Sequence, residues 1–196
     1  MVTAALALAL SSCSKPHVLD AGFWFDRVTF DLPENDLRRL GGPIQEDEKR
    51  RIESVARAEL DAAYAGLRIT FSSALTGFYR VSVVQDIPAR GLPTAGQSRK
   101  LPIGGVGAVN FRTVADHAVA HAPASADRAA IIEGIGRGIG RTAVHEFAHQ
   151  MLPYANLHAS KDVRSYEYGS ADRTEQYYDE LHWDFAKPML EAALGK

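Results

Sequence analysis

The segment AVHEFAHQML, residues 143–152, places two histidines four positions apart, with a glutamate directly after the first. On an α-helix successive residues turn by about 100°, so His145 and His149 lie one turn apart and roughly 40° apart around the axis. Both imidazoles can then bind one metal ion, and Glu146 can reach a water molecule on that ion. The alternative is a chance grouping of side chains that are usually exposed. The spacing favours a metal site at which Glu146 is the general base of a hydrolysis.

A third ligand has to come from elsewhere in the chain, because a catalytic zinc ion usually has three protein ligands and an open position for water. The chain contains a single cysteine, Cys13, so the ligands must be His, Asp or Glu. His158 lies beyond the helix stop at Pro153, where the chain can turn back toward the motif. The candidates after the motif are His158, Asp162, Glu167 and Glu175.

The HExxH pattern on a helix resembles the signature of the zincin metallopeptidases. The longer segment HEFAHQMLPYANLHASKDVRSYEYGS is similar to the corresponding segment of metzincins and matrixins, and the resemblance covers about residues 45–170. It implies an α+β, zincin-like fold in which a small mixed sheet packs on a long active-site helix and on a helix nearer the N-terminus. It also implies that His145, His149 and His158 bind one Zn²⁺ per chain. Glu146 is then the catalytic base that hydrolyses a peptide or protein substrate.

The spacing after the motif departs from the metzincin pattern. The glycine and the third histidine of that pattern fall on Leu152 and Ala155, and Glu167 stands where a turn methionine is expected. An insertion at PYA brings His158 to the position of the third ligand. Glu167 is the first alternative, because EYGSAD is similar to a segment of the thermolysin-like gluzincins. Asp162, as in aspzincins, is the second.

The first residues predict a secretory signal rather than a part of the fold. Residues 3–10 form a mainly apolar run that is too short to span a bilayer and ends in LSSC. This ending resembles the lipobox of bacterial lipoproteins, which implies a signal peptide over 1–12 and acylation of Cys13. Ser14 after the cysteine usually accompanies sorting to the outer membrane. The resemblance therefore implies a protein of the bacterial cell envelope, anchored by lipid on the periplasmic side.

Length and charge narrow the remaining choices. The chain has 196 residues, of which 46% are hydrophobic and 23% charged, which is sufficient for one domain with its own core. We assign residues 13–43 to a tether with a lead-in strand and 44–196 to the metallopeptidase domain, and we expect a monomer. The net charge of −2 and the lack of a basic stripe give no reason to expect nucleic acid as a partner. Membrane contact is expected through the lipid anchor only.

Apolar spacing and chain breakers predict the elements that position the motif. The long helix should begin near Ala126 after the N-cap Ser125 and end before Pro153. The elements expected before it are a strand within 23–30, a helix over 44–67, strands over 68–72 and 77–85, a long loop over 86–107 and a strand over 108–115. The last of these strands could bind an extended substrate as an edge strand.

Three further patterns receive structural interpretations. The glycine-rich run EGIGRGIG, residues 133–140, does not follow a strand as phosphate-binding loops do, so we interpret it as allowing the helix to lie close to the sheet. His117 and His121 are also four apart but lack a flanking glutamate, and we place them at a strand end or in a turn. The aromatic segment 177–190 is expected to be an amphipathic packing helix.

The sequence favours a zinc-dependent metallopeptidase. The alternative is a non-catalytic envelope lipoprotein whose zincin-like scaffold binds a partner or metal. Hydrolysis of a non-peptide amide also stays open. Glu146 discriminates between catalysis and simple metal binding, because metal binding alone does not require it.

Overall fold

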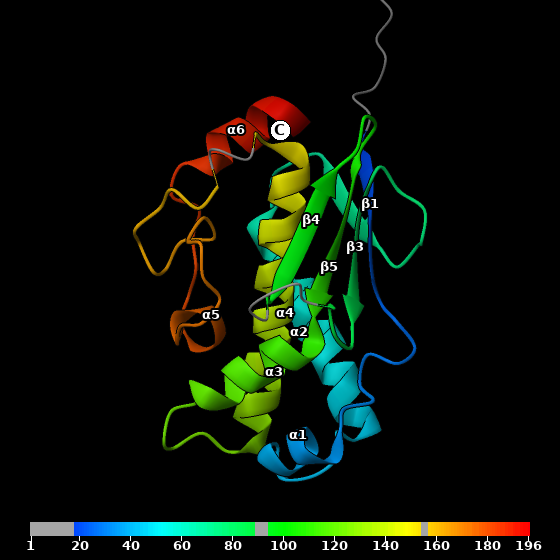
Figure 1. Cartoon of the computed structure of the whole chain (residues 1–196). Coiled ribbons are helices and arrows are strands. Elements are labelled where there is room, and N and C mark those ends of the chain that lie inside the picture. The colour runs from blue at the N-terminus through cyan, green and yellow to red at the C-terminus, as the bar shows by residue number, and fades with distance from the viewer. Residues whose placement is uncertain (1–17, 89–93, 154–156) are drawn as a thin grey trace, which may run out of the picture.

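The computed structural model describes residues 18–88, 94–153 and 157–196, and it contains a five-stranded sheet of order β2-β1-β3-β5-β4 (Figure 1). In chain order the strands are β1 (Leu19–Phe25), β2 (Ile69–Ser72), β3 (Tyr79–Val84), β4 (Gly96–Lys100) and β5 (Gly105–Asn110). β1 pairs in parallel with β2 and β3, and β3 pairs in parallel with β5. β4 runs antiparallel to β5 and forms one edge. The expected mixed sheet and α+β class are confirmed.

The two longest helices, α2 and α4, pack against each other on one face of the sheet (Figure 1). α4 contacts β3, β4 and β5, whereas α2 contacts β2. The strands and α2 therefore hold α4, which carries the HEFAH motif, along the antiparallel edge of the sheet. The helices in chain order are α1 (Glu34–Arg39), α2 (Glu46–Ala63), α3 (Phe111–Ala120), α4 (Arg128–Met151), α5 (Glu175–Tyr178) and α6 (Ala186–Leu194).

The glycine run lies within α4, which is continuous, and allows a close approach to α2 rather than to the sheet. A Cβ atom on Gly136 would lie 2.7 Å from Cβ of Val55, and one on Gly140 would lie 2.5 Å from the carbonyl oxygen of Ala56. The other two glycines of the run face the two tyrosines of α5. The prediction that these glycines allow close packing of the helix is confirmed, but the predicted packing partner, the sheet, was wrong. The glycines alone do not indicate which element a helix packs against.

The core lies between the sheet and these helices. Its largest fully buried apolar side chains come from strands, helices and the C-terminal segment alike. They include Phe23, Ile52, Leu60, Val81, Phe111, Ile135, Ile139, Phe147, Tyr177 and Leu190.

The region 86–115 differs most from the sequence-based expectation. Residues 96–100 form β4 inside the predicted loop, and Phe111–Ala120 form α3 where the predicted strand 108–115 should have continued. β4 reads GQSRK, which has no apolar alternation, because its pairing with β5 rather than side-chain burial defines it. The side chain of Asn110 accepts a hydrogen bond from the backbone N of Thr113 at 3.1 Å, and this N-cap starts α3.

Further boundaries also differ from expectation. The N-cap of α4 is Asp127, whose side chain accepts from the backbone N of Ala130 at 2.8 Å, so Ser125 does not cap the helix. The expected single helix over 177–190 is replaced by the short α5 and by α6, with irregular backbone between them. β1 ends at Phe25, earlier than the predicted strand within 23–30. The helix predicted over 44–67 and the strands predicted over 68–72 and 77–85 are confirmed as α2, β2 and β3.

The lead-in strand is an internal part of the sheet, because β1 lies between β2 and β3. The predicted signal over 1–12 and the predicted acylation site Cys13 lie outside the described residues. Among the residues that the structure describes, no helix is both long enough and apolar enough to cross a bilayer.

Candidate metal centre

Three imidazole nitrogens converge on one point beside α4. Nε2 of His145 lies 2.7 Å from Nε2 of His158 and 2.9 Å from Nε2 of His149, and the remaining pair, His149 and His158, is 3.0 Å apart. An ion at the usual Zn–N distance of about 2.0–2.1 Å can reach all three atoms at once. Among the described residues, His145, His149 and His158 form the one group of His, Cys, Asp or Glu side chains whose ligand atoms lie close enough together to hold a metal ion.

A backbone carbonyl fixes the tautomer of His145. Nδ1 of His145 lies 2.7 Å from the carbonyl oxygen of Tyr166. A carbonyl can only accept, so Nδ1 carries the proton and Nε2 presents a bare lone pair to the other histidines. This second hydrogen bond is the support that metal-binding histidines generally have.

His158 is held in a backbone conformation that few residues adopt. Its φ is +77°, and among the described residues every other positive φ belongs to a glycine. Its backbone N donates to the carbonyl oxygen of Glu167 at 3.0 Å. Such a conformation persists only where the surroundings enforce it, and it is typical of functional sites. It brings the His158 imidazole back to α4 from beyond the helix end.

Glu167, the first alternative ligand, is occupied elsewhere. It is fully buried, and Oε2 accepts from the hydroxyl of Ser165 at 2.5 Å. Oε1 accepts from the backbone N atoms of Phe185 at 3.0 Å and Ala186 at 2.6 Å. The carboxylate therefore anchors the start of α6. It supports the histidine cluster only through its backbone, which holds His158.

Asp162 and Glu175 also lie outside the histidine cluster. Asp162 accepts from the backbone N of Arg164 at 2.8 Å and pairs with His182 at 3.2 Å. Glu175 does not belong to the group of potential ligands among the described residues. Of the four candidates after the motif, the structure brings His158 alone to His145 and His149.

Glu146 is buried in the same cavity as the histidines, with one carboxylate oxygen left without a hydrogen bond among the described residues. Its exposure is 5%, and Oε2 has no hydrogen-bond partner among the described residues. Burial raises the pKa of Glu146 to about 7. A Cβ atom on Gly96 would lie 2.5 Å from Oε1, so this position of β4 must be glycine for the carboxylate to keep its place. A buried carboxylate with an unsatisfied oxygen is typical of a catalytic group.

Burial also keeps the three histidines neutral. It lowers the pKa of His145 to about 3 and that of His149 to about 4, and it lowers the pKa of His158. Neighbouring imidazoles add to the effect at His145 and His149. The neutral imidazole is the form that binds a metal, so the cluster is ready for an ion over the whole neutral pH range.

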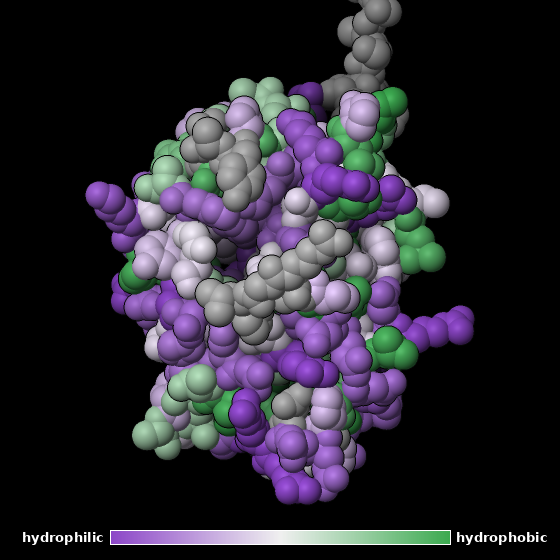
Figure 2. Space-filling model, viewed as in Figure 1, coloured by the Kyte–Doolittle hydropathy of each residue, from purple (hydrophilic) through white to green (hydrophobic). Residues whose placement is uncertain are grey.

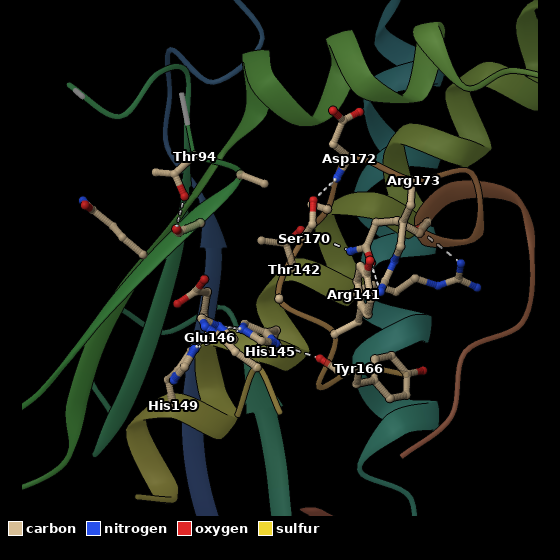
Figure 3. A pocket seen from close by; sticks show the side chains of 18 of the residues that line it. Thr94, Arg141, Thr142, His145, Glu146, His149, Tyr166, Ser170, Asp172 and Arg173 are labelled. Carbon is tan, nitrogen blue, oxygen red and sulfur yellow. Dashed lines mark hydrogen bonds between the residues drawn. The ribbon is translucent and has the colours of Figure 1, made fainter. Parts of the chain in front are cut away.

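The cluster lies in an open cavity of about 680 Å³. One wall is β4 with the residues before it, and the other is the segment 166–173 (Figure 3). Thr94 on the first wall faces Ser170 and Asp172 on the second, with His145, Glu146 and His149 on the floor between them (Figure 3).

Arg141 ties the second wall to the helix, four residues before His145 on α4. Its exposure is 5%, and Nε pairs with Glu59 of α2 at 2.9 Å. Nη1 donates to the carbonyl oxygens of Glu175 at 2.9 Å and Gln176 at 3.1 Å. Sequence reasoning missed this role, and it missed Gly96 and the carbonyl of Tyr166, because their partners are distant in the chain.

His117 lies within α3 and His121 lies in the turn at its C-cap, so the predicted strand end is wrong for both residues and the predicted turn holds for His121. His117 lines the cavity, and Nε2 of His121 lies 2.7 Å from Oδ1 of Asp172. Neither histidine joins the metal-binding group among the described residues.

No protein-family model matches the chain, and no curated protein matches its sequence.

Proposed function

We propose that the protein is a zinc-dependent metallopeptidase of the zincin type. The observation that carries the proposal is the joint placement, on the floor of an open cleft, of three converging imidazoles and the buried carboxylate of Glu146, whose Oε2 has no hydrogen-bond partner among the described residues. A site that only stored metal would have no use for such a carboxylate. This favours hydrolysis over the alternative of a non-catalytic scaffold.

The donor set favours zinc. Three neutral imidazoles suit a borderline ion, and three protein ligands leave a fourth position for water or substrate. When bound, zinc supplies a Lewis acid that lowers the pKa of water and polarises a carbonyl group. We propose one zinc ion per chain, held by His145, His149 and His158.

Glu146 acts as the proton carrier. It accepts the proton of the attacking water and transfers it to the nitrogen of the leaving amine. Its pKa near neutrality in the metal-free protein matches a group that has to take up and release a proton in one cycle. A Cβ atom at Gly96 would meet this carboxylate, so the glycine of β4 leaves room for it beside α4.

An extended peptide would lie along β4. The strand expected over 108–115 does not offer a free edge, because β5 lies between β3 and β4. β4 is the edge strand and also lines the cavity. Unpaired backbone groups of an edge strand can bind a peptide as an additional strand.

The test combines metal content with activity. The full chain should contain about one zinc ion by elemental analysis, as a catalytic zinc site requires. Glu146→Gln should retain that zinc and lose about 10²- to 10⁴-fold in cleavage of an unfolded protein substrate, since the general base is removed. Undiminished cleavage by Glu146→Gln would refute the mechanism. A wild-type chain that takes up no zinc on reconstitution would refute the metal site.

A further inference from the structure

The chain enters the described structure at one end of the sheet, which we name the entry end. β1 and β3 begin there, and the hairpin between β4 and β5, residues 101–104, lies beside them (Figure 1). Exposed apolar side chains gather at this end, with exposures of 49% for Val18, 53% for Phe78 and 71% for Ile103. Figure 2 shows apolar residues at this end of the molecule, in the upper part of the view.

These residues belong to one surface rather than to separate loops. The backbone N of Gly105 donates to the carbonyl oxygen of Phe78 at 2.9 Å, so the hairpin packs directly against the start of β3. Ile103 stands at the tip of that hairpin, in the sequence LPIG. Hairpin tips of soluble domains usually carry Gly, Asn, Asp or Ser, because the tip has no core to pack against. An exposed isoleucine at this place requires a different explanation.

Basic side chains border the apolar ones. Arg99 and Lys100 end β4, where they pair with Val106 and Gly105 of β5, and both are exposed. Neither forms an ion pair with any residue of the described ranges. Apolar tips beside uncompensated cations are the combination that anionic bilayer surfaces attract.

The length of the preceding chain places this end near a bilayer. Cys13, the predicted site of acylation, precedes Val18 by five residues. A residue spans at most about 3.6 Å, so an acyl anchor on Cys13 would hold the entry end within roughly 18 Å of the membrane interface.

We propose that the entry end docks on the bilayer, with Phe78 and Ile103 entering the headgroup region and with Arg99 and Lys100 contacting anionic lipid headgroups. Membrane contact then involves the folded domain as well as the lipid anchor. The orientation follows from β4, which runs from Lys100 at the bilayer to Gly96 beside Glu146, about 13 Å further along the strand. The proposal rests on the lipobox and does not depend on peptidase activity.

Spin labels on the full chain, purified from bacterial membranes, test the orientation. Cys13 is the single cysteine and is blocked when acylated, so Ile103→Cys introduces the one free thiol. Ser125→Cys is the matched control, because it is exposed in the loop between α3 and α4 at the opposite end (Figure 1). Both proteins are reconstituted in phosphatidylcholine vesicles with and without phosphatidylglycerol. Relaxation of the label by oxygen is then compared with relaxation by a water-soluble nickel chelate.

The label at 103 should be several-fold more accessible to oxygen than to nickel, and the label at 125 should show the reverse. Adding Arg99→Glu and Lys100→Glu should reduce immersion of the 103 label in phosphatidylglycerol vesicles only. Arg27→Glu, an exposed arginine beyond the other end of β1, should change nothing. Equal nickel access at 103 and 125 would overturn the docking. A mass that shows no acyl group on Cys13 would overturn it as well, because the tether would be absent.

Discussion

The proposed metal ligands lie on two sides of the cleft, which hold them by different means. One side is α4, which forms the floor, and the other is the irregular segment 158–173, which forms one wall. On the α4 side, His145 and His149 follow from helix geometry, and the helix is fixed by glycine contacts with α2 and by the sheet. On the other side, His158 lies on irregular backbone with φ of +77°. Buried polar bonds rather than a regular element hold that wall, above all those of Glu167 and Arg141. Regular structure can place two ligands from local spacing, whereas the third depends on a network of distant contacts.

The strongest test of this contrast removes the ligand of the irregular wall. His158→Ala should lower zinc affinity by well over the 10- to 100-fold that is typical when a supporting residue is lost, because one of three ligands is missing. Asp162→Asn is the matched control and should bind zinc as the wild type does. Competition with a chelator measures both. Full zinc affinity in His158→Ala would show that the ligand set is different.

Glu167 tests whether polar bonds really hold that wall. Glu167→Ala leaves the buried N–H groups of Phe185 and Ala186 without acceptors, so we expect a loss of about 3–5 kcal/mol in the free energy of unfolding. Zinc affinity should also fall by about 10- to 100-fold through misplacement of His158. Denaturant unfolding of the metal-free protein measures the first effect. Glu180→Ala, an exposed glutamate in the same region, should stay within about 0.5 kcal/mol.

The pH dependence of stability tests the α4 side of this comparison. The pKa of Glu146 is raised to about 7 in the folded, metal-free protein, so this group favours folding below its unfolded pKa and opposes it increasingly as pH rises through 7. Metal-free Glu146→Gln should therefore gain up to about 3 kcal/mol over the wild type between pH 4.5 and pH 8.5. Thermal or urea unfolding at both pH values checks this. A difference between the two proteins that does not change with pH would show that the carboxylate is not desolvated.

The histidines contribute the opposite slope. The pKa values of His145 and His149 are lowered to about 3 and 4, so the unfolded chain binds their protons first when the pH falls below about 6.5. The stability of the metal-free protein should fall from pH 6.5 to pH 4, and the fall should be less steep in wild type than in Glu146→Gln, because protonation of Glu146 offsets part of the loss. A constant melting temperature over that range would contradict the burial of the cluster.

The smallest expected effect concerns the backbone of His158. Both His158→Gly and His158→Ala remove the ligand, but glycine accepts a positive φ without strain. The glycine variant should be about 1 kcal/mol more stable than the alanine variant in the metal-free state. Equal unfolding midpoints would indicate that the left-handed conformation relaxes when the imidazole is absent.

Local patterns in the sequence were sufficient for the motif helix, for α2 and for the strands β2 and β3. Their apolar residues repeat at helical or strand spacing, and this periodicity reflects burial on one face. The relation between His145, Glu146 and His149 follows from the same helical spacing. Cys13 and the predicted signal stay predictions, because they lie outside the described residues.

Tertiary structure alone decided the rest. The sequence ranked His158 ahead of Glu167 and Asp162 as third ligand by family resemblance alone. Contacts in the fold show which of them faces α4 and which anchors α6 or a turn. β4 was invisible in the sequence because an edge strand of polar residues is specified by backbone pairing, which leaves no side-chain pattern. The need for glycine at position 96 follows only from its contact with Glu146, which is distant from it in the chain. Periodicity records the burial of one element, whereas a site made from several elements depends on contacts that no local pattern contains.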